Sequence, residues 1–308
     1  MSRVALNFVD VHRHFGKKVA LDGVSLTVKA GEVLGMIGRN GAGKTTALRL
    51  ALGTLHPDSG TIRTLGFDTV SQGMAVRTRV SLLSEESALY EDLTVDEMIS
   101  FAASLHPRWD DDLSDEFRER LHLDLSPKIK TLSRGDRAKV SLLLAVAARP
   151  QLLLLDDPTA GIDPLVRREV LEGILDAIPS EGGSVIYASH LIEDVERVAD
   201  RVLVLDAGKI VLERAIEQLK HEARRVTAIF ENSAPEIVHD AALGVRRRGR
   251  SFDAVALDRI DALAGTLRQA GARDVLVSPA SLEDVLIACL REDASSDDRE
   301  DVKEMSHV

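Results

Sequence analysis

One glycine-rich segment constrains this chain more than any other feature, because it follows the phosphate-loop pattern G-x-x-x-x-G-K-[ST]. It reads Gly38-Arg39-Asn40-Gly41-Ala42-Gly43-Lys44-Thr45, and Thr46 follows it. The glycines let the backbone curl with positive φ, so that several N–H groups can face an anion at the start of the next helix. We expect Lys44 to reach the β- and γ-phosphates of a nucleotide and the Thr45 hydroxyl to bind Mg²⁺. A glycine-rich turn that only connects a strand to a helix is the alternative.

The flanking sequence favours the functional interpretation of this loop. The apolar run from Val33 to Ile37 precedes it, and residues 47–52 continue as a helix that we expect to end at Gly53. Elsewhere, short and fully apolar runs alternate with helical segments from residue 31 to about residue 210. This alternation predicts a mainly parallel sheet covered on both faces. The clearest buried strands are expected at residues 33–37, 152–155, 184–187 and 202–205.

The remaining segments predict an α/β chain of two domains. Residues 4–8 and 21–28 flank a turn around Gly16 and are expected to form an antiparallel edge. The polar residues 86–140 are expected to form an inserted helical subdomain, with helical starts near Asp96 and Asp115. We predict a nucleotide-binding domain over residues 1–222, a small α+β accessory domain over residues 223–290, and a disordered acidic tail over residues 291–308.

Within the accessory domain, strands are expected at residues 225–230, 252–257 and 274–277, with a helix at residues 260–269. The capping box that starts at Ser281 opens the last helix. The basic run of residues 246–250 suggests phosphate or anionic lipid contact, but a solvated hairpin turn is the interpretation that we prefer.

Composition excludes several classes of function. The chain has 308 residues, a net charge of −11 and 3% aromatic residues, so we expect no nucleic-acid partner. Its single cysteine, Cys289, excludes an internal disulfide and suits a reducing cytoplasm. The sequence after Met1 lacks the apolar core of a secretion signal, and the most apolar stretch, residues 140–155, is interrupted by Arg149 and Pro150. We therefore expect a chain that does not cross a membrane by itself.

Four further segments stand in order behind the loop. They are Leu132-Ser133-Arg134-Gly135-Asp136-Arg137, then Leu152-Leu153-Leu154-Leu155-Asp156-Asp157-Pro158-Thr159, then Ala160-Gly161-Ile162-Asp163, and finally Ser189-His190. In this order and spacing the chain resembles an ATP-binding cassette (ABC) ATPase, the nucleotide-binding subunit of ABC transporters. The resemblance covers residues 1 to about 220. It implies the ABC type of P-loop NTPase fold, with ATP and Mg²⁺ as cofactors.

The resemblance assigns a role to each matching residue. Asp156 would hold Mg²⁺ opposite Thr45, and Asp157 stands where the family has a glutamate that polarises the attacking water. Aspartate is one methylene shorter, and a misplacement near 1 Å can reduce a rate by about 100-fold. His190 matches the switch histidine that contacts the γ-phosphate, and with Asp157 and Lys44 it completes the expected catalytic set. Phe15 matches the aromatic residue that stacks on adenine, although a packed edge residue is the alternative. A satisfied surface histidine is the corresponding alternative for His190.

Two other segments depart from the family pattern. Glu85 takes the Q-loop position near the metal and near the membrane subunit, where the family usually has glutamine, which both donates and accepts hydrogen bonds. The family signature Leu-Ser-Gly-Gly-Gln binds the ATP of the opposite subunit. Here Ser133 and Gly135 match it, while Arg134 replaces a glycine and Asp136 replaces the glutamine. Because such a site is completed in trans, the working unit is expected to be a dimer with a second cassette subunit, identical or not.

We predict an ABC ATPase at the cytoplasmic face of the cell membrane that powers a separate membrane-spanning permease. Residues 225–290 resemble the small domain that follows the cassette in drug- and antibiotic-exporter ATPases, so export is the expected direction. Asp163 takes the D-loop position of the family. One alternative is a catalytically weak or regulatory cassette in a heterodimer, which Asp157, Asp136 and Glu85 together suggest. Another is a soluble cassette protein that acts on DNA or ribosomes. Such proteins usually carry two cassettes or long coiled-coil insertions, and this chain has one cassette and no heptad run.

Overall fold

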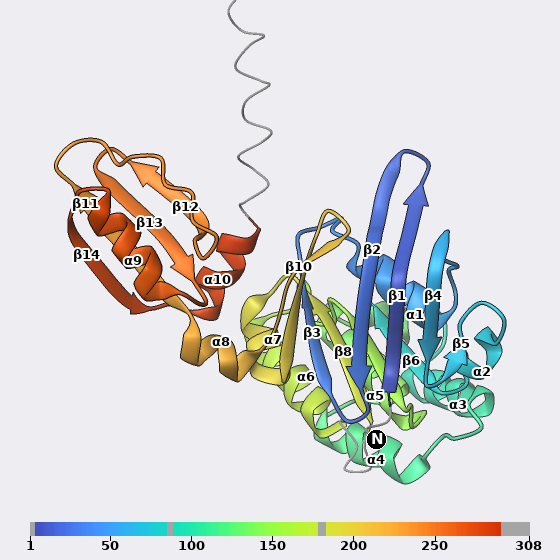
Figure 1. The fold of residues 1–308 in the computed structure, drawn as a ribbon. Helices are drawn as coiled ribbons and strands as arrows, with labels where there is room; N and C mark the ends of the chain where they lie inside the picture. Colours follow the sequence, from blue (N-terminus) through green and yellow to red (C-terminus); the bar gives the residue numbers. More distant parts are fainter. Residues whose placement is uncertain (1–3, 85–88, 178–182, 291–308) are drawn as a thin grey trace, which may run out of the picture. The chain divides into compact units, whose positions relative to one another are not determined.

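The computed structural model describes residues 4–84, 89–177 and 183–290, and the chain forms two compact units that divide between Ile210 and Val211 (Figure 1). The predicted boundary at residue 222 stays a prediction. Glu85 and the acidic tail over residues 291–308 lie outside the described residues. Across the described part of the chain, no helix combines the length and the apolar character needed to span a membrane.

The first unit begins with the predicted antiparallel edge. Its strands are β1 (Val4–Phe15), β2 (Lys18–Lys29), β4 (Ser59–Thr64) and β5 (Phe67–Asp68), in the order β2-β1-β4-β5. β1 pairs with β2 in antiparallel register across a turn at Gly16, whose φ of 60° is easily reached by glycine. The prediction of an antiparallel edge is confirmed.

A second sheet has six strands in the order β10-β9-β3-β8-β7-β6. They are β3 (Val33–Ile37), β6 (Val80–Ser84), β7 (Leu152–Asp156), β8 (Ser184–Ser189), β9 (Arg201–Asp206) and β10 (Lys209–Ala215). β3 pairs in parallel with β8 and β9, and β7 pairs in parallel with β6 and β8. All residues of β3, β7 and β8 are buried, which explains their uninterrupted apolar sequences. The parallel pairing brings the carboxyl ends of these strands to one edge.

Helices connect these strands and form the segment that is inserted between β6 and β7. They are α1 (Lys44–Leu52), α2 (Gly73–Arg77), α3 (Val95–Leu105), α4 (Asp111–Arg120), the 3-10 turn η1 (Ile129–Thr131), α5 (Arg134–Ala147), α6 (Pro164–Ala177) and α7 (Ile192–Val198). The predicted helical start near Asp115 is wrong, because the side chain of Asp110 accepts a hydrogen bond from the N–H of Leu113 and α4 begins at Asp111.

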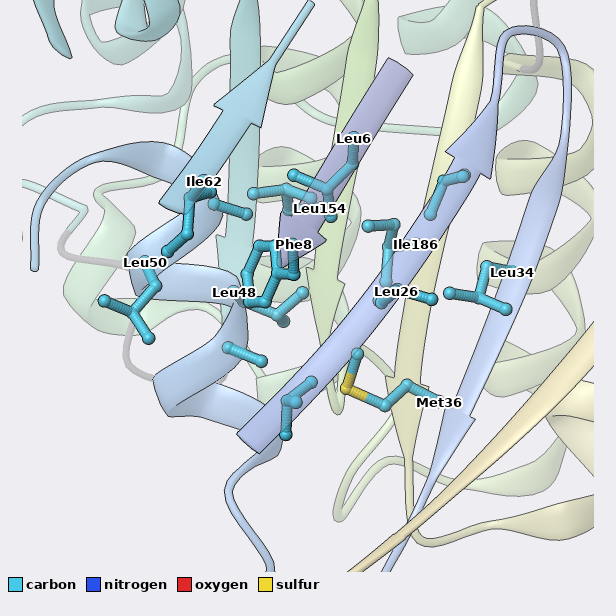
Figure 2. Close-up of a cluster of buried hydrophobic side chains, with 14 of the residues drawn as sticks. Leu6, Phe8, Leu26, Leu34, Met36, Leu48, Leu50, Ile62, Leu154 and Ile186 are labelled. Carbon is cyan, nitrogen blue, oxygen red and sulfur yellow. The ribbon is translucent and has the colours of Figure 1, made fainter. Parts of the chain in front are cut away.

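The core of the first unit lies between the two sheets and holds α1 in place. Figure 2 shows Leu48 and Leu50 of α1 among apolar side chains from both sheets. The neighbours labelled there are Leu6, Phe8, Leu26, Leu34, Met36, Ile62, Leu154 and Ile186. Burial of one such side chain stabilises the fold by about 1.5–3 kcal/mol. The start of α1 is therefore fixed relative to the edge where the parallel strands end.

The second unit is a four-stranded antiparallel sheet with helices. Its strands are β11 (Arg224–Phe230), β12 (Leu243–Arg248), β13 (Ser251–Ala256) and β14 (Ala272–Pro279), and its helices are α8 (Ile216–Glu222), α9 (Ile260–Gln269) and α10 (Leu282–Cys289). The strand order is β12-β13-β11-β14. The basic run turns from β12 into β13, which confirms the predicted hairpin. The predicted capping box at Ser281 is confirmed as well.

Candidate nucleotide site

The phosphate loop joins β3 to α1, and neighbouring backbone leaves no room for a side chain at two of its glycines. Gly41 and Gly43 have φ values of 84° and 113°, which other residues rarely adopt. A Cβ atom at Gly38 would lie 2.3 Å from the carbonyl oxygen of Leu205, and one at Gly43 would lie 2.4 Å from that of Ala20. The close approach of neighbouring backbone therefore requires glycine at both positions.

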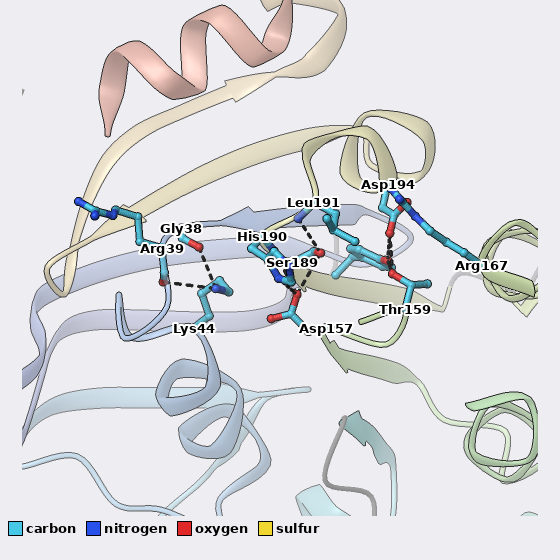
Figure 3. Close-up of polar contacts among 11 residues, drawn as sticks. Gly38, Arg39, Lys44, Asp157, Thr159, Arg167, Ser189, His190, Leu191 and Asp194 are labelled. Atoms are coloured by element: carbon cyan, nitrogen blue, oxygen red, sulfur yellow. Dashed lines mark hydrogen bonds and ion pairs between the residues drawn. The ribbon is translucent and has the colours of Figure 1, made fainter. Parts of the chain in front are cut away.

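Lys44 is the first residue of α1 and is buried, with 6% of its surface exposed. Its ammonium group donates a hydrogen bond of 2.8 Å to the carbonyl oxygen of Gly38, and the carbonyl oxygen of Arg39 lies 3.4 Å away (Figure 3). These contacts hold the positive charge inside the curve of the loop. The charge and the N-terminus of α1 together make the loop a favourable place for an anion.

Asp156 ends β7 and is buried next to the start of α1. Burial raises the pKa of its carboxyl group, and the negative charge of Asp157 adds to the shift. A hydrogen bond with Thr45 and the charges of Lys44 and Arg49 act in the opposite direction. The carboxylate and the hydroxyl are oxygen ligands of the kind that Mg²⁺ takes beside nucleotide phosphates, so this pair fits the ion.

Asp157 and His190 are brought together at the ends of adjacent strands. Oδ1 of Asp157 lies 2.8 Å from Nδ1 of His190, and it accepts hydrogen bonds of 3.1 Å from the His190 backbone N–H and from the Ser189 hydroxyl. Asp157 has a φ of 47°, a left-handed conformation that aspartate tolerates better than most residues. Figure 3 shows Lys44, Asp157 and His190 along one edge of the sheet.

The signature segment opens α5 as predicted, with Ser133 as its N-cap. The Ser133 hydroxyl accepts a hydrogen bond of 3.1 Å from the Asp136 N–H, and it donates one of 2.7 Å to Oδ2 of Asp136. Arg134 reaches towards the turn after β7, because its Nη1 lies 2.6 Å from the position that a Cβ of Gly161 would take. The side chain of Asp136 thus turns back onto its own helix end.

Two more predicted residues lie near these elements. Oδ1 of Asp163 accepts hydrogen bonds from the N–H groups of Leu165 and Val166, at 3.0 and 3.2 Å, and so caps α6. Phe15 ends β1 with 46% of its surface exposed, and the guanidinium of Arg13 lies 4.7 Å from the ring centroid. The ring is therefore not a core residue.

The sequence did not indicate two features of this region. One is a buried polar cluster of Thr159, Arg167, Tyr187 and Asp194. The other is a groove of about 530 Å³ between α3, β6 and α5. Several exposed aromatic and aliphatic residues line the groove, among them Tyr90, Phe101 and Leu105. These apolar residues in a mostly polar segment were the sequence feature that could have indicated it.

Comparisons with known proteins agree on one family. The family model described as "ABC transporter" matches residues 21–160. The chain is 32% identical to the daunorubicin resistance ATP-binding protein DrrA3 of Streptomyces coeruleorubidus, over 93% of this chain and 96% of that protein. It is 30% identical to the ABC transporter ATP-binding protein YtrB of Bacillus subtilis, over 89% of this chain and 93% of that protein.

Solved structures show the same likeness. The structure of an ATP-binding subunit of an ABC transporter superposes with a TM-score of 0.64 and 25% identity, over 70% of this chain and 92% of that chain. The cassette MJ0796 bound to ADP and Pi superposes with a TM-score of 0.62 and 20% identity, over 68% of this chain and 98% of that one, and this likeness shows the fold alone.

Proposed function

Since the chain belongs to the family of ATP-binding ABC transporter subunits, we propose that Lys44, Asp156, Asp157 and His190 form its site of ATP hydrolysis. As a member of this family it is an ABC-type ATPase. The observation that carries the proposal is the 2.8 Å contact between Asp157 and His190 at the edge where the phosphate loop begins. A nucleophile-activating group and its orienting partner within hydrogen-bond distance are what such chemistry requires.

Each residue of the proposed site has a separate role in ATP binding or hydrolysis. The loop N–H groups and Lys44 bind the β- and γ-phosphates, and Thr45 with Asp156 would hold Mg²⁺, which when bound neutralises charge on the phosphates. Asp157 accepts a hydrogen bond from the attacking water and directs its oxygen at the γ-phosphorus. The bond to the β-phosphate oxygen breaks, ADP leaves, and the proton of the water passes to Asp157 or to the released phosphate. His190, oriented through Nδ1, presents Nε2 to the γ-phosphate.

The experiment that tests this site compares Asp157→Asn with Asp112→Asn, a matched change at an exposed position of α4. We expect Asp157→Asn to reduce kcat by at least about 100-fold, because the general base is lost, with ATP affinity within a few fold of the wild type. Asp112→Asn should hydrolyse ATP at the wild-type rate. Full turnover by Asp157→Asn would show that another group activates the water.

We further propose that the groove between α3, β6 and α5 receives a helix of the membrane-spanning permease. Its rim exposes Leu105 at 61%, and the rings of Tyr90 and Phe101 stack edge to face with centroids 5.1 Å apart. An exposed apolar patch of this kind is a typical protein contact surface. Leu105→Asp should abolish co-purification of the permease from detergent-solubilised membranes, and Val238→Asp, at an exposed position of the second unit, should not. Unchanged co-purification of Leu105→Asp would place the permease elsewhere.

The direction of transport and the place of action rest on the relatives. DrrA3 is named a daunorubicin resistance protein, and a protein of Mesorhizobium japonicum that is 30% identical over 93% of this chain is named a Nod factor export ATP-binding protein. These names support export. We propose that the subunit acts at the inner face of the cell membrane, with the permease and a second cassette as partners. The test uses inverted vesicles that contain the permease and this subunit. Because their cytoplasmic face points outwards, we expect the transported compound to enter the vesicles when ATP is added. Depletion of the vesicle interior would indicate import.

A catalytically weak cassette in a heterodimer is the second candidate, because the Ser133 hydroxyl already donates a hydrogen bond to the carboxylate of Asp136. This hydroxyl would otherwise be available to the nucleotide of the partner subunit. The identity of the second cassette in the purified complex separates the two cases. A different cassette with glutamate after its magnesium-binding aspartate supports the heterodimer, and two copies of this chain support the homodimer.

A further inference from the structure

One buried carboxylate of this region, that of Asp194, has no part in the mechanism above. The side chain of Asp194 is 2% exposed. Its Oδ2 accepts hydrogen bonds of 2.6 Å from the Thr159 hydroxyl and 3.1 Å from the Tyr187 hydroxyl. Its Oδ1 accepts a hydrogen bond of 2.6 Å from Nε of Arg167, as drawn in Figure 3. Both oxygens of one buried charge are thus satisfied by three side chains.

These partners come from the segments that enter and leave the site. Thr159 lies in the turn that follows Asp157, and Tyr187 lies in β8 shortly before Ser189 and His190. Asp194 itself lies in α7, the helix that follows His190, and Arg167 lies in α6. One carboxylate therefore ties together the exit from β7, the end of β8 and the start of α7.

The turn at Asp157 is fixed at both of its ends. On the strand side, the N–H of Asp157 donates a hydrogen bond of 2.8 Å to the carbonyl oxygen of Ala188. Within the turn, the N–H of Ala160 donates one of 3.1 Å to the carbonyl oxygen of Asp157. On the far side, the Thr159 hydroxyl donates a hydrogen bond of 2.6 Å to Oδ2 of Asp194. Since Asp157 has a left-handed backbone, the direction of its carboxylate depends on how this turn is held.

Burial of a charge in this place has a cost that an apolar side chain would avoid. Buried ion pairs are often no more stabilising than apolar residues of similar volume, whereas they hold their partners in one defined geometry. The charge of Asp194 also acts on its neighbour Tyr187. Burial raises the pKa of the Tyr187 hydroxyl, and the negative charge of Asp194 raises it further. A hydrogen-bond acceptor at this point orients two hydroxyl groups at once, that of Thr159 in the turn after β7 and that of Tyr187 in β8.

We propose that Asp194 is a positioning residue that sets the relative placement of Asp157 and His190 through Thr159 and Tyr187. The inference rests on the proposed hydrolytic site. Misplacement of a catalytic group by about 1 Å reduces a rate by on the order of 100-fold, so loss of one hydrogen bond in the cluster affects turnover more than nucleotide binding.

The test uses conservative variants at Thr159 and Asp194, whose hydroxyl and carboxylate are joined by the 2.6 Å hydrogen bond. Thr159→Val removes the hydroxyl, Thr159→Ser restores it, and Asp194→Asn removes the charge. We expect Thr159→Val and Asp194→Asn to lower kcat by about 10- to 100-fold with KM within about twofold, and Thr159→Ser to recover most of the rate. Ile62→Ala, a buried change in β4 away from the cluster, serves as the stability control and should keep the wild-type kcat per folded molecule.

A second readout does not depend on turnover. The ring nitrogens of His190, assigned in ¹⁵N spectra by comparison with His190→Gln, report the hydrogen bond to Asp157. In Thr159→Val this signal should move towards that of a free imidazole, while in Thr159→Ser and in Ile62→Ala it should keep its wild-type position. If Asp194→Asn does not fold, the two Thr159 variants carry the test alone.

The outcomes separate this inference from the proposed function. If Asp157→Asn abolishes turnover while Thr159→Val and Asp194→Asn keep both kcat and the His190 signal, the positioning role is wrong and the hydrolytic site stands. If Asp157→Asn leaves turnover intact, the proposed site is wrong and the inference falls with it. A fall of kcat only in proportion to the loss of folded protein, matched by Ile62→Ala, would also overturn the positioning role.

Discussion

The phosphate loop and the signature segment are both glycine-containing turns that open a helix, yet they are built in different ways. In the phosphate loop, neighbouring backbone leaves no space at Gly38 and Gly43, and the charge of Lys44 is held by carbonyl oxygens of the loop itself. In the signature segment, the polar contacts are between the side chains of Ser133 and Asp136 on an accessible helix end. The main chain fixes the first site, and side chains determine the second.

This difference explains two of the chain's departures from its family pattern, those at Arg134 and Asp136. The phosphate loop matches the pattern at every fixed position, whereas the departures occur at Glu85, Arg134, Asp136 and Asp157. In the loop, a substitution of a glycine would force backbone to move. In the signature segment, a substitution changes only which groups meet the phosphate of the partner subunit. Arg134 and Asp136 therefore lie where side chains can change without a movement of the backbone, whereas Glu85 and Asp157 lie outside both segments.

Removal of the Lys44 ammonium is the largest expected effect and tests the first half of the comparison. Lys44→Ala should lower ATP affinity by about 10- to 100-fold, because a charge-assisted hydrogen bond contributes about 1.5–3 kcal/mol, and it should abolish ATP-dependent dimerisation. Calorimetric titration with ATP and light scattering with and without ATP measure the two effects. Arg63→Ala, an exposed change in β4, is the control. Dimerisation of Lys44→Ala at wild-type ATP concentrations would contradict the assigned role.

A pair of glycine variants compares the two segments directly. Gly43→Ala places a Cβ 2.4 Å from the carbonyl oxygen of Ala20 at a φ of 113°, so it should lower the thermal midpoint strongly and prevent nucleotide binding. Gly135→Ala places its Cβ 2.9 Å from Cγ1 of Val166, a side-chain atom that can move. Its midpoint should fall much less. Equal losses in both variants would show that the signature glycine is as constrained as the loop glycine.

The sequence predicted those parts of the fold that are buried on all sides and therefore consist of apolar residues. The strands β3, β7, β8 and β9 were predicted because strands buried on both faces need uninterrupted apolar residues. β12 was not predicted, since it ends in arginines that turn into a hairpin. The start of α4 was predicted too late, because one side chain, that of Asp110, decides where the helix begins. Local side-chain contacts are weak signals in a single sequence.

The same limit applies to the candidate site. The loop was predicted from its own motif, and Asp156, Asp157 and His190 were predicted from the resemblance to ABC ATPases. The structure places all of them at one edge of the sheet. The bond between Asp136 and Ser133 was not predicted, although Ser133 and Asp136 have the same S-x-x-D spacing that predicted the capping box at Ser281. The cluster around Asp194 depends on three segments meeting in space, which no local pattern reveals.

Asp136→Gln tests the second half of the comparison, with a smaller expected effect. The substitution removes the carboxylate that accepts from Ser133 and restores the family residue, so the hydroxyl becomes available to a phosphate. We expect ATP-dependent dimerisation to tighten by about threefold, since one hydrogen bond contributes about 0.5–1.5 kcal/mol. Glu119→Gln, an exposed change in α4, controls for the change in net charge. Unchanged dimerisation would mean that the Ser133–Asp136 contact does not limit the signature segment.

The last two variants test the ion pairs beside the two segments. Glu32 precedes β3, its side chain is 13% exposed, and it pairs with Arg201 at 2.5 Å, whereas Glu91 pairs with Arg137 beside the signature segment at 3.5 Å and is exposed. Burial by itself raises the pKa of Glu32, but hydrogen bonds from Arg201 and from the Lys29 N–H outweigh it, so the pKa lies below its usual value. The ionised carboxylate therefore stabilises the folded state.

Since the folded pKa of Glu32 lies below the value of about 4.3 in the unfolded chain, the stabilisation is complete above that pH and is lost as the pH falls through the folded pKa. Glu32→Gln should destabilise the protein by about 1–2 kcal/mol at pH 7, measured by urea unfolding, and the difference from wild type should shrink below about pH 4. Glu91→Gln should change little at either pH, because exposed ion pairs contribute little. A larger effect of Glu91→Gln would mean that the signature segment is held as firmly as the phosphate loop, and the distinction between a site fixed by the main chain and one set by side chains would fail.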